Sequence, residues 1–170
     1  MILRDDITKI VKSQRNSIIN RNQGVIRHDI IKIQPHHNFA IILSGIRRCG
    51  KSTLLVQMMK KEENFYYLNF EDPRLIDFTI QDYEVLEEVF HQEYGFHDLY
   101  FFDEIQNLSG WEYYIRHLLD SEKKVIITGS HASLLSRELG TKITGRNLQL
   151  ELFPFSYQEY LEYTHKEDSD

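Results

Sequence analysis

Apolar and polar residues follow two different spacings along this chain. Short, nearly continuous apolar runs predict buried strands, and they lie at residues 39–43, 64–70, 99–102, 124–129 and 147–153. Elsewhere apolar residues recur every three or four positions, which predicts helices, near residues 5–20, 54–59, 83–90, 111–119 and 157–163, with another ending near 139. Strands that alternate with helices predict an α/β fold, in which a mainly parallel sheet is covered on both faces as a three-layer sandwich.

The first helix and the end of the chain stand outside this alternation. The helix at 5–20, capped by Asp5 or Asp6, is expected to be appended to the surface, with a docking element as the alternative. The stretch Val25–Ile33 is ambiguous between strand and helix. A capping box from Ser109 to Glu112 is expected to open the helix at 111. We therefore predict an N-terminal helical extension at 1–24, one domain at 25–165 and a flexible tail at 166–170.

A phosphate-binding loop is predicted between the first strand and the next helix. The segment from Gly45 to Ser52 reads G-I-R-R-C-G-K-S and fits the P-loop (Walker A) pattern G-x-x-x-x-G-K-[ST]. The N–H groups of such a loop converge on one point, where the helix dipole adds positive potential. Lys51 is expected to act at the β- and γ-phosphates, and the Ser52 hydroxyl is suited to Mg²⁺. The expected nucleotide-binding residues are Gly45, Ile46, Arg47, Arg48, Cys49, Gly50, Lys51, Ser52 and Thr53.

Two carboxylates follow the apolar run at 99–102. Asp103 is expected to hold Mg²⁺ from the end of a strand beside the loop, as the Walker B acid does in P-loop proteins. Glu104 is then placed to act as the general base on an attacking water. The alternative for Glu104 is a solvated residue at the start of a helix.

Composition limits the class of protein. A length of 170 residues with 41% apolar content suits one α/β domain. No run approaches the roughly 20 apolar residues of a membrane span, and no basic-then-apolar leader opens the chain. The single cysteine, Cys49, excludes an internal disulfide, so a cytoplasmic location is expected. A net charge of −6 gives no strong nucleic-acid signal.

Several segments, in order, resemble a family of bacterial and archaeal AAA-like ATPases. They are the loop at 45–52, F-D-E-I-Q at 102–106, I-T-G-S at 127–130, L-L-S-R-E-L at 134–139, T-G-R-N at 144–147 and E-L-F-P-F-S-Y-Q-E-Y-L at 151–161. The resemblance covers roughly Ile26 to Leu161 and implies ATP hydrolysis. Members usually continue into a C-terminal domain of uncharacterised role, so an effector domain or partner is expected beyond this segment.

The resemblance also implies a strand order and further site residues. With Glu104 as base, it implies the order 5-1-4-3-2, which puts the strand at 124–129 between those that carry the loop and Asp103. A polar residue at its end would then sense the γ-phosphate as sensor 1. Ser130 is the first choice and Thr128 the second, and Ser130 also suits a helix cap.

Phosphoryl transfer needs a positive charge at the transferred group. Arg146 is the first candidate for an arginine finger, followed by Arg137 and then by Arg47 and Arg48 in the loop. For each of these arginines, an ordinary surface position or an ion pair with a carboxylate is as good an explanation as a catalytic role. Whether the finger acts on its own chain or on a neighbour's stays open, as does self-association into a homo-oligomer.

ATP is the expected nucleotide, because the Asn-Lys-x-Asp segment that reads guanine is missing and because of the resemblance. The predicted function is Mg²⁺-dependent hydrolysis of ATP to ADP and phosphate, slow in this domain alone and coupled to an effector domain or partner. The alternative is a nucleotide-dependent binding switch with little hydrolysis. A kinase is disfavoured by the Asp103–Glu104 pair.

Overall fold

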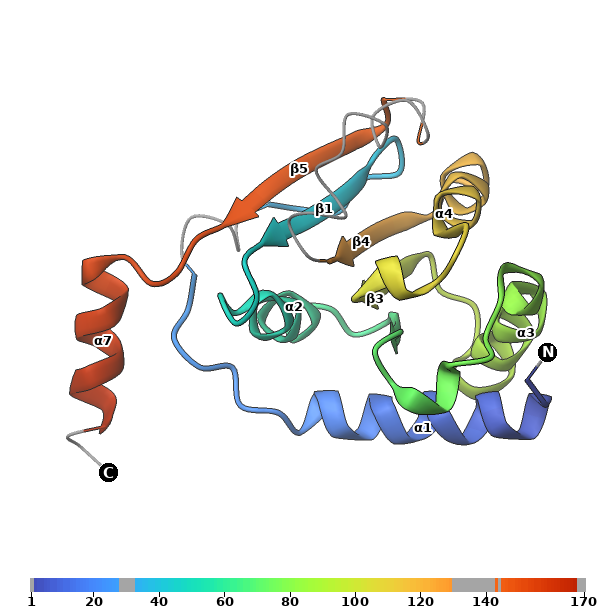
Figure 1. The fold of residues 1–170 in the computed structure, drawn as a ribbon, viewed down its shortest axis with the longest axis horizontal. Helices are drawn as coiled ribbons and strands as arrows, with labels where there is room; N and C mark the ends of the chain where they lie inside the picture. Colours follow the sequence, from blue (N-terminus) through green and yellow to red (C-terminus); the bar gives the residue numbers. More distant parts are fainter. Residues whose placement is uncertain (1, 28–32, 130–142, 144, 168–170) are drawn as a thin grey trace.

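The computed structural model describes residues 2–27, 33–129, 143 and 145–167, and its centre is a five-stranded sheet (Figure 1). The strands are β1 (Ala40–Gly45), β2 (Tyr66–Asn69), β3 (Leu99–Asp103), β4 (Lys124–Thr128) and β5 (Asn147–Leu152). Every pairing between them is parallel, in the order β2-β3-β4-β1-β5. This is the expected order 5-1-4-3-2 counted from the other edge, so the α/β prediction and the strand order are confirmed.

Helices α1 (Arg4–Ile19), α2 (Lys51–Met59), α3 (Tyr83–Tyr94) and α4 (Trp111–Asp120) pack around the sheet, and α7 (Tyr157–Glu167) stands apart beyond the end of β5 (Figure 1). Short 3₁₀ turns lie at Pro73–Leu75, Ile80–Asp82 and Ile105–Asn107. Successive side chains of a strand point to opposite faces. Accordingly Ile42 packs in a core with α1, α3 and α4, whereas Ile41 and Leu43 pack in a second core with α2. The result is three layers.

The first helix is part of the first core. Ile7, Ile10 and Val11 of α1 are buried among residues of the sheet, α3 and α4. Gln14 also spans to β2, because its side chain accepts from the Asn69 N–H at 2.7 Å and donates to the Asn69 carbonyl at 3.1 Å. The expectation of an appended surface helix was therefore wrong: this helix closes the β2 edge of the sheet.

Helix ends account for the other differences. The residue before α1 is Leu3, whose side chain makes no cap, so Asp5 and Asp6 lie within the first turn. Gly110 precedes α4 with φ 77°, and the capping box expected at Ser109 does not form. α7 runs to Glu167, into the expected tail, and the helix expected to end near 139 lies outside the described residues. Within the described part of the chain, no helix is long and apolar enough to cross a membrane.

Candidate functional site

The loop after β1 is fixed by two glycines. At Gly45, with φ 153°, a Cβ would lie 2.3 Å from the carbonyl oxygen of Leu152 on β5. Only glycine allows this approach of the two strands. Gly50 has φ 98° and leads directly into α2, which begins at Lys51. The loop therefore opens the helix, and the N–H groups of the first helical turn face the carboxyl edge of the sheet.

Lys51 lies across this loop. Its side chain is almost fully buried, and its ammonium donates to the carbonyl oxygens of Gly45 at 3.2 Å and Ile46 at 3.1 Å. These two bonds hold the charge over the mouth of the loop. A phosphate bound to the helix N–H groups would meet it there.

Asp103, Ser52 and Thr128 form one hydrogen-bonded group. Asp103, at the end of β3, is 2% exposed, and its carboxylate accepts from the hydroxyls of Thr128 and Ser52. Burial raises the pKa of Asp103, and the two hydrogen bonds oppose this only in part. The structure thus brings together both residues expected to hold Mg²⁺. Their donor set fits the ion, because hydroxyl and carboxylate oxygens are the ligands that it prefers.

Glu104 is held by the same threonine. Its backbone is left-handed, with φ 52° and ψ 47°, which is uncommon for a residue with a Cβ. Its N–H donates to Thr128 Oγ1 at 3.0 Å, and its Oε2 accepts from Gln106 Nε2 at 2.6 Å. The Thr128 hydroxyl therefore accepts from Glu104 and donates to Asp103. Thr128, the second choice for sensor 1, thus lies between the phosphate loop and the Asp103–Glu104 pair. Ser130, the first choice, lies outside the described residues.

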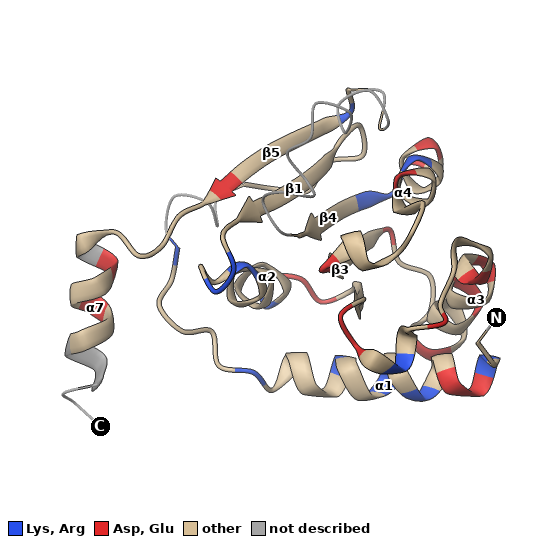
Figure 2. Ribbon diagram, viewed as in Figure 1, with Lys and Arg blue, Asp and Glu red and all other residues tan. Residues whose placement is uncertain are grey.

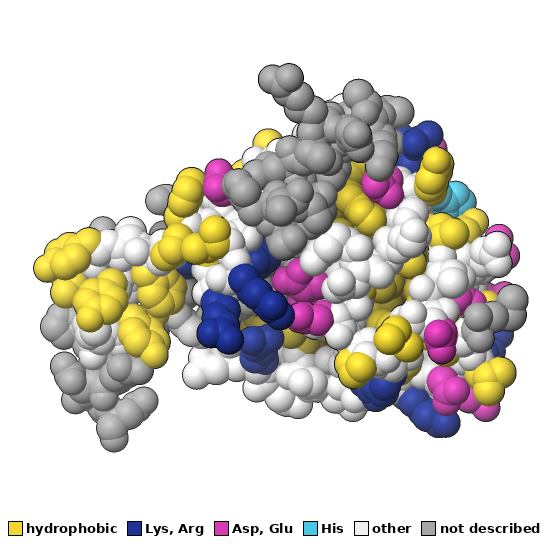
Figure 3. All heavy atoms as spheres, in the orientation of Figure 1, with side chains coloured by type: hydrophobic (Ala, Val, Ile, Leu, Met, Phe, Trp, Pro, Cys, Tyr) yellow, Lys and Arg dark blue, Asp and Glu magenta, His cyan; other side chains and the backbone are white. Residues whose placement is uncertain are grey.

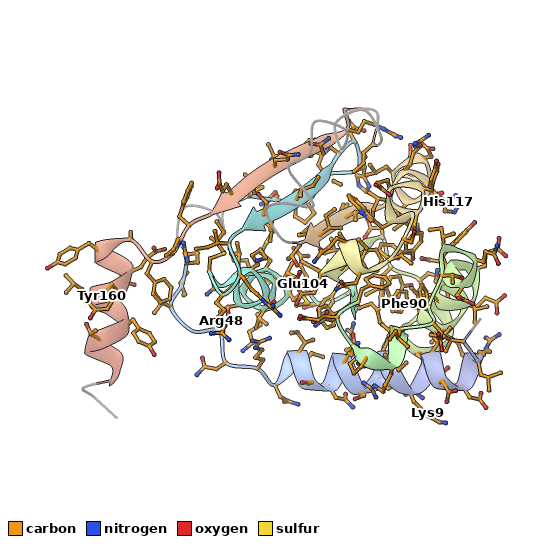
Figure 4. All side chains as sticks on the ribbon, in the orientation of Figure 1. Lys9, Arg48, Phe90, Glu104, His117 and Tyr160 are labelled. Atoms are coloured by element: carbon orange, nitrogen blue, oxygen red, sulfur yellow. The ribbon has the colours of Figure 1, made fainter. Side chains whose placement is uncertain are left out.

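The candidate arginines lie at different ends of the sheet. Figure 4 labels Arg48 beside the loop and Glu104 at the end of β3, on the same edge. Arg146 precedes β5, where its carbonyl accepts from the Ala40 N–H, and its guanidinium pairs with Asp120 at 2.7 Å. β1 and β5 run parallel from that point to Gly45, about 20 Å away at roughly 3.3 Å per residue.

Arg146 therefore does not reach the phosphate loop of its own chain. As an arginine finger for its own chain, Arg146 is therefore excluded. Its action on a neighbouring chain stays a prediction. Arg137 lies outside the described residues. Arg47 reaches from the loop to Glu71, with Nη2 and Oε1 3.3 Å apart.

Arg27 is a contact that the sequence reasoning missed. It is 7% exposed, and its guanidinium donates to the carbonyl oxygens of Cys49 at 3.4 Å and Phe153 at 2.7 Å. It also pairs with Glu159 of α7 at 2.8 Å and lies over the ring of Phe155. One side chain thus joins the phosphate loop to the segment after β5. The sequence offered only a weak signal, because Arg27 is one of three charged residues among the apolar ones at 25–33.

The charge pattern agrees with an anionic ligand at this edge. Lys and Arg positions lie in the loop between β1 and α2, and Asp and Glu positions lie at the end of β3 (Figure 2). Loop amides and Lys51 suit phosphate oxygens, the Ser52–Asp103 pair suits a divalent cation, and Glu104 suits a proton acceptor. The arrangement can bind a nucleoside phosphate and activate a water beside it.

Comparisons with known proteins agree with this fold. Residues 37–161 match the AAA_14 family, an AAA domain. The chain is 38% identical over 151 residues to the uncharacterized protein MJ1544 of Methanocaldococcus jannaschii, covering 87% of this chain and 34% of that protein. It is 34% identical over 136 residues to an uncharacterized protein of Haemophilus influenzae, covering 73% of this chain and 33% of that protein. The chain thus spans about a third of the length of these relatives.

Two solved structures show the same fold at low identity. AMPPCP-bound DnaA from Aquifex aeolicus has a TM-score of 0.54 and 15% identity, covering 84% of this chain and 49% of that chain. Saccharomyces cerevisiae RIF2 has a TM-score of 0.52 and 10% identity, covering 98% of this chain and 69% of that chain. At these identities the likeness shows the fold alone.

Proposed function

Because the chain belongs to the AAA_14 family of AAA domains, we propose that it binds ATP with Mg²⁺ and hydrolyses it to ADP and phosphate. The observation that carries the proposal is the hydrogen-bonded group at the strand ends. It joins Ser52 of the loop helix, Asp103 of β3 and Thr128 of β4, with Glu104 attached through its backbone. Residues from three separate elements meet where a nucleotide phosphate would lie.

Each residue has a defined role in this proposal. The loop amides and Lys51 bind and orient the phosphates, and Ser52 and Asp103 would hold Mg²⁺. The ion would neutralise charge that develops on the phosphate oxygens. Glu104 accepts the proton of the attacking water, and Thr128 positions it by fixing its backbone.

Hydrolysis by this segment alone is proposed to be slow and to be coupled to an effector domain or partner. The relatives support this, because the segment that matches the chain is only about a third of their length. Cytoplasmic location and self-association belong to the same proposal.

The test is phosphate release from ATP, with and without Mg²⁺, over a range of protein concentrations. Glu104→Gln should abolish turnover while ATP still binds, because the amide keeps the shape of the side chain but accepts no proton. Lys51→Ala should abolish binding as well. Turnover by Glu104→Gln equal to the wild type would refute the role of Glu104. Specific activity that rises with concentration would indicate a site completed between chains.

A binding switch is the second candidate, and Arg27 favours it. This side chain contacts the loop carbonyl of Cys49 and the carboxylate of Glu159 on α7, so a change in the loop can be passed to that helix. In a switch, Glu104→Gln would stay locked in its ATP-bound form and keep its output. In a motor the same variant would lose output. Hydrogen exchange of α7 with ATP and with ADP, for wild type and variant, separates the two.

A further inference from the structure

We propose that Arg47 is a catalytic residue that acts within its own chain, where its guanidinium binds the γ-phosphate during hydrolysis. Glu71 competes with the phosphate for that guanidinium. The proposal rests on the proposed ATPase function and adds the positive charge that the site requires. It starts from the ion pair between the two residues, 3.3 Å apart.

The sheet order and the ion pair together indicate the direction in which the Arg47 side chain extends. Arg47 is in the loop after β1, and Glu71 follows the end of β2. Two strands, β4 and β3, stand between β1 and β2, so the two ends are about 14 Å apart at roughly 4.8 Å per strand spacing. The loop and the arginine together span this distance. The ion pair therefore shows that the Arg47 side chain extends from the loop towards the end of β2, at the carboxyl edge of the sheet.

The residues at the ends of β4 and β3 are the reacting part of the site. β4 ends at Thr128, and β3 ends at Asp103, which is followed by Glu104. In the space-filling view, Lys and Arg side chains lie directly beside Asp and Glu side chains between α2 and β3 (Figure 3). Once released from Glu71, the Arg47 guanidinium would lie at the same edge of the sheet as the Glu104 carboxylate and a bound phosphate.

The pair with Glu71 is suited to exchange. Both side chains are largely exposed, at 86% and 58%, and exposed ion pairs contribute little to stability. A triphosphate offers more negative charge and a matching pair of oxygens for the planar guanidinium. Phosphate oxygens are therefore the stronger partner, and Arg47 can change partner by moving its own side chain.

The chemical step balances with these groups alone. A water oxygen attacks the γ-phosphorus, its proton passes to Glu104, and the bond from the γ-phosphorus to the bridging oxygen of ADP breaks. Arg47 stabilises the negative charge on the transferred oxygens, which is the role of an arginine finger in related enzymes. Arg146 cannot do this in its own chain, because it lies at the other end of the sheet.

The first test separates catalysis from binding. Arg47→Ala should lower kcat about 10³-fold, the lower end of the range for such arginines, and change ADP affinity less than about threefold, since ADP has no γ-phosphate. Arg47→Lys should recover part of the ATP affinity and little of kcat, because lysine keeps the charge without the planar fork. Lys60→Ala is the matched control: it removes one exposed charge from the other end of α2. A kcat for Arg47→Ala within threefold of that of Lys60→Ala would overturn the proposal.

A second measurement keeps the test valid if turnover is undetectable. The affinity for ATPγS relative to ADP, measured by calorimetry, should fall at least about tenfold in Arg47→Ala and stay unchanged in Lys60→Ala. Glu71→Gln should raise ATPγS affinity by no more than about fivefold, the most expected from an exposed pair. An unchanged preference in Arg47→Ala would overturn the contact with the γ-phosphate. If the wild type does not hydrolyse ATP but still prefers ATPγS to ADP through Arg47, the ATPase function is refuted and the contact between Arg47 and the γ-phosphate stands.

Mixing variants tests action within one chain. Lys51→Ala lacks a working loop but keeps Arg47, so a mixture with Arg47→Ala tests whether one chain can supply the arginine to another. No recovery of phosphate release is expected. Recovery in the mixture would place the arginine in a neighbour's site and overturn the proposal.

Discussion

Replacing Asp103 by Asn should stabilise the protein in the absence of nucleotide and remove Mg²⁺-dependent ATP binding. Asp103 is 2% exposed, and burial raises its pKa, so the folded chain is destabilised when this carboxylate is charged. Asn has almost the same shape. Its amide can still accept from the Thr128 hydroxyl and can donate to that of Ser52, so the hydrogen-bonded group survives.

The expected magnitude follows from the charge that is removed. A buried polar group without full compensation costs about 1–3 kcal/mol, and two hydroxyl bonds compensate Asp103 in part. Asp103→Asn should therefore raise the free energy of unfolding by about 1–3 kcal/mol. For a chain of this size that corresponds to roughly 2–12 °C in Tm.

Urea unfolding at several pH values is the assay. The folded-state pKa is raised, so the cost of the charge is fully present above that pKa and disappears as pH falls below the unfolded value, near 3.9. The gap in stability between variant and wild type should close as the pH falls. A variant less stable than the wild type at neutral pH, or a gap independent of pH, would refute this electrostatic account.

Three further substitutions test the architecture around the site. Thr128→Val should cost about 1–3 kcal/mol and lower kcat, because the Glu104 N–H loses its acceptor; urea unfolding and phosphate release check both, and a kcat equal to the wild type would contradict the positioning role. Glu159→Gln should cost about 1–3 kcal/mol near neutral pH, since it removes the charge paired with Arg27. Burial alone would raise the pKa of Glu159, but its hydrogen bonds and the nearby arginine lower it. The decrease in the free energy of unfolding should therefore be largest above the pKa of Glu159 in the unfolded chain, near 4.3, and should disappear as the pH falls through its pKa in the folded chain. A decrease independent of pH would exclude the ion pair as its cause. Gly45→Ala should abolish nucleotide binding and cost at least about 1–3 kcal/mol, because its Cβ would meet a β5 carbonyl at 2.3 Å; circular dichroism verifies the fold, and calorimetric binding like that of the wild type would disprove the steric argument.

The sequence predicted the parts of this molecule that depend on local pattern. Apolar runs place the five strands within a few residues of their observed positions, since burial on both faces leaves little choice of residue. The spacing of Gly45, Gly50 and Lys51 predicts a loop that opens a helix, and the structure has one. The contact between Ser52 and Asp103 follows from the strand order, which the sequence supplied only through a family resemblance.

Other features depend on contacts between distant segments, which no local pattern encodes. The closing of the β2 edge by α1 requires Gln14 to meet Asn69, 55 positions away. The distance between Arg146 and the phosphate loop follows from the register in which β5 pairs with β1. The neighbouring Gly145 gives no information about that register. Glu104 has a left-handed backbone, and its N–H donates to Thr128, 24 positions along the chain. The burial of Arg27 needs Glu159, far along the chain, as its partner.

The contacts of Arg27 have a consequence for whatever packs against α7. The side chains of Phe155, Tyr157 and Tyr160 around that helix are exposed, and Arg27 ties the same segment to the Cys49 carbonyl in the phosphate loop. Coupling between two sites is reciprocal in free energy. If nucleotide shifts the position of α7 through Arg27, a partner that fixes α7 must change nucleotide affinity by the same factor. The occupant of that apolar surface and the nucleotide would then act as each other's effectors.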